Sequence, residues 1–158
     1  MTGINERADS QSWHPGEPFS LVQTGVFSEP DEDGAIHLLG QRCKSCGASM
    51  FPRSRRCVSC FSEDLADIKF DRTGRVDSFT TVHQAPPGYL GPVPYVLAMV
   101  ILGNGVHVLA HLTGRHVDEW RRGELVSSRA IALTPGNGDT PPRLGFAFGP
   151  ADNEETAR

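Results

Sequence analysis

The clearest chemical signal comes from four cysteines, which form two C-x-x-C pairs with ten residues between the pairs. Two residues between cysteines allow both sulfurs of a tight turn to point at one ion, and two such turns facing each other complete a tetrahedral S₄ site. Gly47 follows the first pair and suits the positive φ that such a turn needs, whereas Phe61 follows the second pair. The spacing predicts one metal site with four ligands: Cys43, Cys46, Cys57 and Cys60.

The ligand type limits the choice of metal. Four thiolates in a tetrahedral arrangement suit zinc, and they also suit the single iron of a rubredoxin-type electron carrier. Two disulfides are a further alternative, but no basic segment followed by an apolar one stands near Met1, so we expect a cytoplasmic protein with reduced cysteines. Because four protein ligands leave no position open for a substrate, we interpret the site as structural zinc that stabilises a segment too small to have its own core.

Other chemically active side chains form no recognisable catalytic group. His107 and His111 lie four residues apart on an expected strand and share one face with Leu109, but no nucleophile or carboxylate stands close to them in the sequence. We expect these histidines to face solvent or a partner. His83 stands alone in a loop, and no glycine-rich phosphate-binding motif is present. The sequence predicts no catalytic residues and no active site of its own.

Charge is unevenly distributed along the chain. A formal net charge of −4 disfavours a dedicated nucleic-acid-binding protein, and the longest apolar run, residues 95–102, is far too short to span a membrane. Residues 40–57 nevertheless contain five basic side chains and no acidic one: Arg42, Lys44, Arg53, Arg55 and Arg56. This basic segment is typical of a site that binds a phosphate-bearing small molecule or an acidic partner surface. The alternative is that these side chains belong to a charged zinc loop that is simply solvated.

Short apolar runs bounded by Gly and Pro indicate a mainly β protein. Five strands are expected: residues 75–83, 95–102, 106–112, 125–133 and 144–148. The run at 95–102 is apolar throughout, as for a strand buried on both faces or wrapped inside a barrel. Residues 116–122 form the one expected helical turn, between the third and fourth strands. This order is that of an OB-fold barrel, although a five-stranded sandwich fits the same periodicity.

The predicted fold is mainly β, with a rubredoxin-like zinc ribbon followed by a five-stranded OB-fold barrel. Four parts are expected: a flexible N-terminal arm over 1–35, the zinc ribbon over 36–64, the barrel over 65–150 and a disordered tail over 151–158. The first 20 residues and the tail are polar and lack hydrophobic periodicity, whereas residues 21–37 allow a short turn and strand.

A proline-rich loop joins the first two expected strands of the barrel. Residues 85–95 contain four prolines in eleven positions, which excludes a central strand but stiffens the loop. A stiff loop loses less entropy when it binds, so we predict a partner interface at Tyr89, Leu90 and Tyr95. Rigid closure of the barrel is the alternative reading of this loop.

Several motifs occur together and in order. They are Gly40-Gln-Arg-Cys43-x-x-Cys46-Gly47, Phe51-Pro52-Arg53, the second C-x-x-C, Gly74-Arg75-Val76, the Ala85-Pro-Pro loop and the closing Phe146-x-Phe148-Gly-Pro. In this combination the chain resembles the zinc-ribbon/OB-fold proteins of acyl-CoA metabolism over about residues 36–150. The proline-rich loop is most similar to that in small subunits of the benzoylsuccinyl-CoA thiolase type, which belong to anaerobic toluene breakdown.

The resemblance implies a partner class and a ligand. Members of this family are typically small non-catalytic subunits in heteromeric complexes with thiolase-like acyltransferases, aldolases or MaoC-type enoyl-CoA hydratases, in aromatic, sterol or polyketide pathways. CoA carries phosphates, and guanidinium groups bind phosphate through two parallel hydrogen bonds, so the resemblance points to Arg53, Arg55 and Arg56 as CoA ligands. A nucleic-acid-binding ribbon–OB module is the alternative from another functional class.

Overall fold

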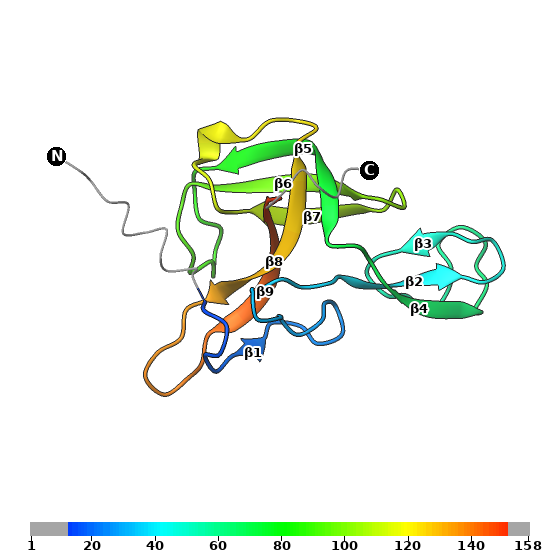
Figure 1. Cartoon of the computed structure of the whole chain (residues 1–158), viewed down its shortest axis with the longest axis horizontal. Helices are drawn as coiled ribbons and strands as arrows, with labels where there is room; N and C mark the ends of the chain where they lie inside the picture. Colours follow the sequence, from blue (N-terminus) through cyan, green and yellow to red (C-terminus); the bar gives the residue numbers. More distant parts are fainter. Residues whose placement is uncertain (1–12, 152–158) are drawn as a thin grey trace.

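The structure, a computed structural model, describes residues 13–151, and its regular elements are strands apart from one short 3₁₀ helix (Figure 1). Its elements are β1 (Ser20–Leu21), β2 (Leu39–Cys43), β3 (Ser49–Met50), β4 (Leu65–Lys69), β5 (Thr73–Val82), β6 (Tyr95–Leu102), β7 (His107–Leu112), the 3₁₀ helix η2 (Val117–Glu119), β8 (Leu125–Thr134) and β9 (Arg143–Pro150). The outer parts of the predicted arm and tail, residues 1–12 and 152–158, lie outside the described residues.

Five of the strands close into a barrel. They follow the order β9-β7-β6-β5-β8, and a long antiparallel pairing of β8 with β9 joins the two ends of this sheet. The short helix η2 lies between β7 and β8, which are the third and fourth barrel strands. The predicted OB-fold barrel is therefore confirmed, and the five-stranded sandwich is excluded.

Alternation along β6 and β7 fills the barrel interior. Both strands direct every second side chain inward, and these positions are buried: Val96, Ala98, Val100, Leu102, Val108, Ala110 and Leu112. Gly74 of β5 faces this core, because a Cβ there would lie 2.6 Å from Cγ1 of Val100. Trp120, which follows η2, is 1% exposed and joins the same core.

The segment that leads into the ribbon packs on the barrel. The sequence did not indicate this packing, because it predicted a flexible arm up to residue 35. Strand β1 pairs in parallel with the start of β9, and Phe27 is a buried core residue. Ile36 and Leu38, which lie farther along the same segment, are also buried in the barrel core. The β1–β9 pairing joins Ser20 to Arg143, and the hydrogen bond between Ser128 and Ile36 joins residues 92 positions apart, so no local periodicity predicts these contacts.

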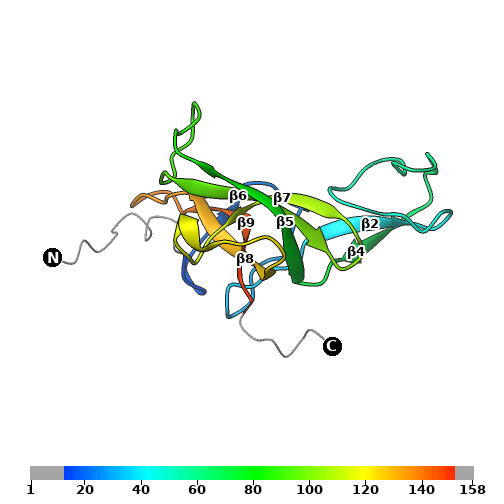
Figure 2. The ribbon, with the colours of Figure 1, turned by 90° about the horizontal axis from the view of Figure 1, so that it is seen from above.

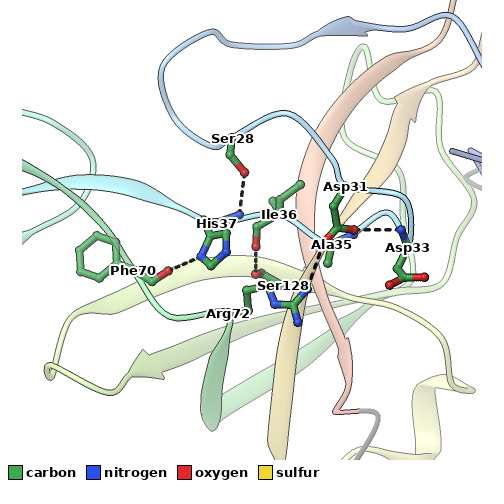
Figure 3. A network of polar contacts seen from close by, with 9 residues as sticks. All are labelled: Ser28, Asp31, Asp33, Ala35, Ile36, His37, Phe70, Arg72 and Ser128. Carbon is green, nitrogen blue, oxygen red and sulfur yellow. Dashed lines mark hydrogen bonds and ion pairs between the residues drawn. The ribbon is translucent and has the colours of Figure 1, made fainter. Parts of the chain in front are cut away.

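Polar contacts hold this segment in place (Figure 3). The backbone N–H of His37 donates to Oγ of Ser28 at 3.0 Å, and Nδ1 of the same histidine lies 2.9 Å from the carbonyl oxygen of Phe70. On the barrel side, the Ser128 hydroxyl is buried and donates to the carbonyl oxygen of Ile36 at 2.6 Å. The segment that leads into the ribbon is thus hydrogen-bonded to the chain just after β4, at Phe70, and to barrel strand β8, at Ser128.

Aromatic packing joins the ribbon to the barrel. The ring of Phe51, just after β3, meets Phe70 edge-on at 6.3 Å and Phe146 of β9 edge-on at 5.8 Å. Gly40 of β2 allows this close approach, because a Cβ there would lie 2.4 Å from both the Met50 carbonyl oxygen and the Phe70 ring. The three-stranded ribbon sheet, in the order β3-β2-β4, therefore sits at one end of the barrel (Figures 1 and 2).

Across residues 13–151, no helix is long and apolar enough to cross a membrane.

We expect Ser128→Ala to destabilise the fold by about 1–3 kcal/mol, because it leaves the buried Ile36 carbonyl without its hydroxyl donor. Urea unfolding followed by tryptophan fluorescence measures the change. The control is Ser127→Ala, next along β8 and only half-buried, which should change the free energy of unfolding by less than about 0.5 kcal/mol. Equal effects of the two substitutions would contradict this role for Ser128.

Candidate metal centre and surrounding surface

Two tight turns carry the four cysteines, and we call Cys43–Gly47 the first knuckle and Cys57–Phe61 the second. The two turns close in the same way: the N–H of Gly47 donates to the Cys43 carbonyl at 2.9 Å, and the N–H of Phe61 donates to the Cys57 carbonyl at 3.0 Å. The closing residues have φ values of +79° and +63°. The repeated geometry brings the sulfurs of both turns to one point.

The four sulfur atoms lie within 4.8 Å of one another. The Cys46 and Cys57 sulfurs are 3.5 Å apart, and those of Cys43 and Cys60 are 3.6 Å apart. These separations are close to the edge of about 3.8 Å in a tetrahedron with zinc–sulfur bonds of about 2.3 Å. They are far longer than a disulfide bond of about 2.05 Å, and all four cysteines are free. The residues fit the predicted thiolate site for one metal ion.

The thiols influence each other's protonation. The backbone N–H of Cys46 lowers the pKa of Cys43 to about 6, and the backbone N–H of Cys60 lowers the pKa of Cys57. At Cys60 the backbone N–H of Ser62 acts in the lowering direction, but burial and the three neighbouring thiols raise the pKa to about 12. Four thiolates this close therefore need a cation to compensate their charge.

A cleft of about 500 Å³ separates the ribbon from the β6–β7 hairpin. Ribbon residues on its lining include Arg53, Ser54 and Val58, and hairpin residues include Asn104, Val106 and His107. The guanidinium of Arg53 faces Asp67 of β4 at 3.5 Å. The cleft thus combines apolar walls with one cationic side chain.

The structure partly neutralises the basic segment. Besides Arg53, Arg56 pairs with Glu63 at 2.9 Å and Lys44 pairs with Asp64 at 3.6 Å. These acids follow the segment in sequence, so its composition alone did not reveal them. Arg55 forms no ion pair with any residue in the range 13–151. Of the three predicted CoA ligands, Arg55 is the most available for an added anion.

The proline-rich loop leaves the barrel between β5 and β6, on the side away from the ribbon (Figure 2). Its Tyr89 ring lies 4.7 Å from that of Tyr95, which in turn stacks on His111 at 5.0 Å. Leu90 is 68% exposed at the loop tip. Burial in this stack lowers the pKa of His111, whereas His107 is exposed. The two histidines share the outer face of β7, as predicted.

The outer face of β6 is apolar too, which is unusual for a strand whose other face already lines a core. Its outward side chains are each half-buried: Tyr95, Leu97, Met99 and Ile101. Leu109 of β7, paired with Met99, is 60% exposed. Of the two alternatives that the sequence left open for this strand, a place in the barrel wall is confirmed and burial on both faces is not, because the outward side chains are only half-buried.

Comparison with known proteins agrees with this architecture. Residues 33–66 match a family model described as the ChsH2 rubredoxin-like zinc ribbon domain, and residues 68–130 match the ChsH2 C-terminal OB-fold domain. The chain is also 32% identical to benzoylsuccinyl-CoA thiolase subunit BbsA of Geobacter metallireducens, over 78% of this chain and 81% of that protein. The chain belongs to the ChsH2 zinc-ribbon/OB-fold family. The predicted resemblance is confirmed.

Two further proteins are similar along most of their length. A DUF35 domain-containing scaffold protein of Pyrococcus furiosus is 30% identical over 75% of this chain and 86% of its own. The solved structure of an Ltp2-ChsH2(DUF35) aldolase superposes with a TM-score of 0.59 and 26% identity, covering 72% of this chain and 84% of that one. The ChsH2 ribbon match and the sulfur geometry together support a structural zinc ion.

We expect about one zinc ion per chain, and we expect Cys57→Ser to release it and to cost the ribbon several kcal/mol of folding free energy, because three ligands leave the shell incomplete. Elemental analysis of reduced, natively purified protein gives the metal content, and a colourless preparation distinguishes zinc from iron. Ser59→Ala, in the same knuckle, is the control that should retain metal. Metal-free wild-type protein would refute the assignment.

Proposed function

We propose that this chain is a non-catalytic subunit of a thiolase-type acyl-CoA acyltransferase complex, acting in the cytoplasm in degradation of an aromatic compound or a sterol side chain. The similarity to a thiolase subunit over 81% of that subunit's length supports this assignment. Within residues 13–151, no serine or cysteine is hydrogen-bonded to a histidine ring, and the thiols are gathered in the metal site. The chemistry is therefore assigned to a partner.

The observation that carries the proposal is the apolar outer face of the barrel. Tyr95, Leu97 and Met99 of β6 form a row beside the exposed Leu109, and the loop that carries the exposed Leu90 contacts this row through Tyr89, whose ring lies 4.7 Å from that of Tyr95. None of these positions carries charge, and the centres of protein interfaces are likewise depleted of charged residues. Such a face suits a heteromeric contact in which Tyr89, Leu90 and Tyr95 meet the catalytic subunit.

A second part of the proposal concerns acyl-CoA. The cleft between ribbon and hairpin lies beside Arg53, and its walls include Phe51 and Val106, which suit an adenine ring. Arg55, with no ion pair among the described residues, and Arg56 lie on the same ribbon and supply further guanidinium groups for phosphate. We assign the CoA nucleotide to this boundary between the ribbon and the catalytic subunit.

To test the assembly, the chain is co-expressed in turn with each thiolase-type polypeptide of the organism that encodes it. Native mass spectrometry should show a heteromeric complex, thiolase turnover should require the catalytic subunit, and the isolated chain should show none. Reproducible acyl-CoA turnover by the isolated chain, or failure of the two polypeptides to associate, would refute the proposed function.

The CoA contact predicts a change in KM without loss of assembly. In the complex, Arg55→Ala with Arg56→Ala should raise the KM for CoA, with each lost phosphate contact worth about 1–3 kcal/mol. Arg121→Ala, an exposed arginine after η2, is the matched control and should leave KM unchanged. If the double variant dissociates from its partner, the arginines pair with acidic side chains of the catalytic subunit instead of CoA.

A second partner class is favoured by one observation. The Ltp2-ChsH2(DUF35) aldolase shares the fold of this chain at a TM-score of 0.59, so an aldolase is the alternative catalytic partner. A MaoC-like enoyl-CoA hydratase is a further alternative. Co-expression with each candidate under the same conditions distinguishes these classes by which complex forms.

Single-stranded oligonucleotides should not bind to the chain, and tight, salt-dependent binding would instead favour the nucleic-acid-binding module.

A further inference from the structure

The second knuckle contains a conformational anomaly. Its closing residue, Phe61, has a φ of +63°, and it is the one non-glycine residue with positive φ in the range 13–151. In this left-handed region the Cβ of an L-residue crowds the backbone, so glycine is favoured, as at Gly47 in the matching position of the first knuckle. The chain thus holds a bulky aromatic residue where its own backbone geometry favours glycine.

Packing within the chain does not explain this choice. The Phe61 side chain is 73% exposed, and Val58 of the same knuckle is 69% exposed. These are the two highest exposures among the large hydrophobic residues described. We call this pair, Val58 and Phe61, the second-knuckle tip. It presents an aromatic and an aliphatic group to solvent without contributing to either hydrophobic core.

The backbone beneath the tip is held firmly. The N–H of Cys57 donates to the Ser62 carbonyl at 2.8 Å, and the Ser62 hydroxyl lies 3.0 Å from that of Ser45 in the first knuckle. The same hydroxyl accepts the N–H of Asp64 at 3.1 Å. A side chain carried on a fixed backbone loses less entropy when an interface buries it, and aromatic anchors commonly dominate binding energy.

The tip is continuous with the proposed interface. The outward row of β6 runs from Tyr95 beside the proline-rich loop to Ile101, which pairs with His107. His107 lines the cleft between the ribbon and the hairpin, and Val58 lines the same cleft from the ribbon side. An acyl-CoA with its nucleotide in this cleft must extend to the active site of the catalytic subunit, so that subunit has to lie against the cleft and its rim.

We infer that the second-knuckle tip is a docking element that inserts Phe61 into an apolar pocket on the catalytic subunit. This inference rests on the proposed function and adds a contact outside the barrel face. The partner pocket is apolar because it must accept a phenyl ring and an isopropyl group. The left-handed conformation of Phe61 then directs the ring away from the ribbon and toward the partner.

The test uses two substitutions at Phe61 that relieve the backbone strain of its positive φ and remove the aromatic ring. Phe61→Gly and Phe61→Asn both tolerate positive φ, and the full-length variants are titrated against the thiolase-type subunit that forms the complex with the wild-type chain. We expect the Kd to rise at least tenfold for each, while the thermal midpoint of the isolated chain stays equal to or above that of the wild type. Val22→Ser removes another exposed apolar side chain, beyond β1, and should leave the Kd unchanged.

The outcomes separate the two proposals. Unchanged Kd values for both Phe61 variants, with wild-type binding intact, overturn the docking element and leave the proposed function standing. A weaker Kd accompanied by lower thermal midpoints in both variants means that the ring supports the fold, which also overturns it. If the wild-type chain binds no catalytic subunit, both proposals fail together.

Discussion

The packing of Phe51 between Phe70 and Phe146 fixes the relation between the two parts of the molecule. A small metal-held ribbon has little apolar surface of its own, so its orientation depends on whatever it packs against. Because the ring meets β9 as well as the chain after β4, the ribbon cannot turn without separating aromatic contacts on both sides. The cleft beside Arg53, and the position of both knuckles relative to β6, follow from this junction.

The parts of the structure that the sequence predicted are those determined by short-range patterns. The spacing of Cys43, Cys46, Cys57 and Cys60 is a local feature, and the structure gathers their sulfurs within 4.8 Å. The face that His107, Leu109 and His111 were expected to share is likewise the outer face of β7. A ligand turn or a strand face is encoded by residues two to four positions apart, so no knowledge of distant partners is needed.

The features that the sequence left unpredicted depend on distant residues. Residues 20–35 were assigned to a flexible arm, with only a short turn and strand allowed over 21–37, because their partners, such as β9 and Ser128, lie about 100 residues away. The arginines read as an uncompensated basic patch because Asp67, the partner of Arg53, belongs to the following strand. The strand at 95–102 was expected either to be buried on both faces or to be wrapped inside a barrel, and the sequence could not decide between the two because composition reports apolarity without reporting which faces the chain itself covers.

The parallel pairing of β1 with β9 has a consequence for biosynthesis. Ser20 lies beside Arg143, so an early segment of the chain finds its partner strand only when the last barrel strand has been made. Until then Phe27, Ile36 and Leu38 lack the closed barrel that buries them, and a nascent chain with such exposed apolar groups is prone to aggregation. The ribbon can bind metal earlier, because its four ligands are complete by Cys60. The order of synthesis therefore allows the ribbon to bind metal before the last strand is available to close the barrel.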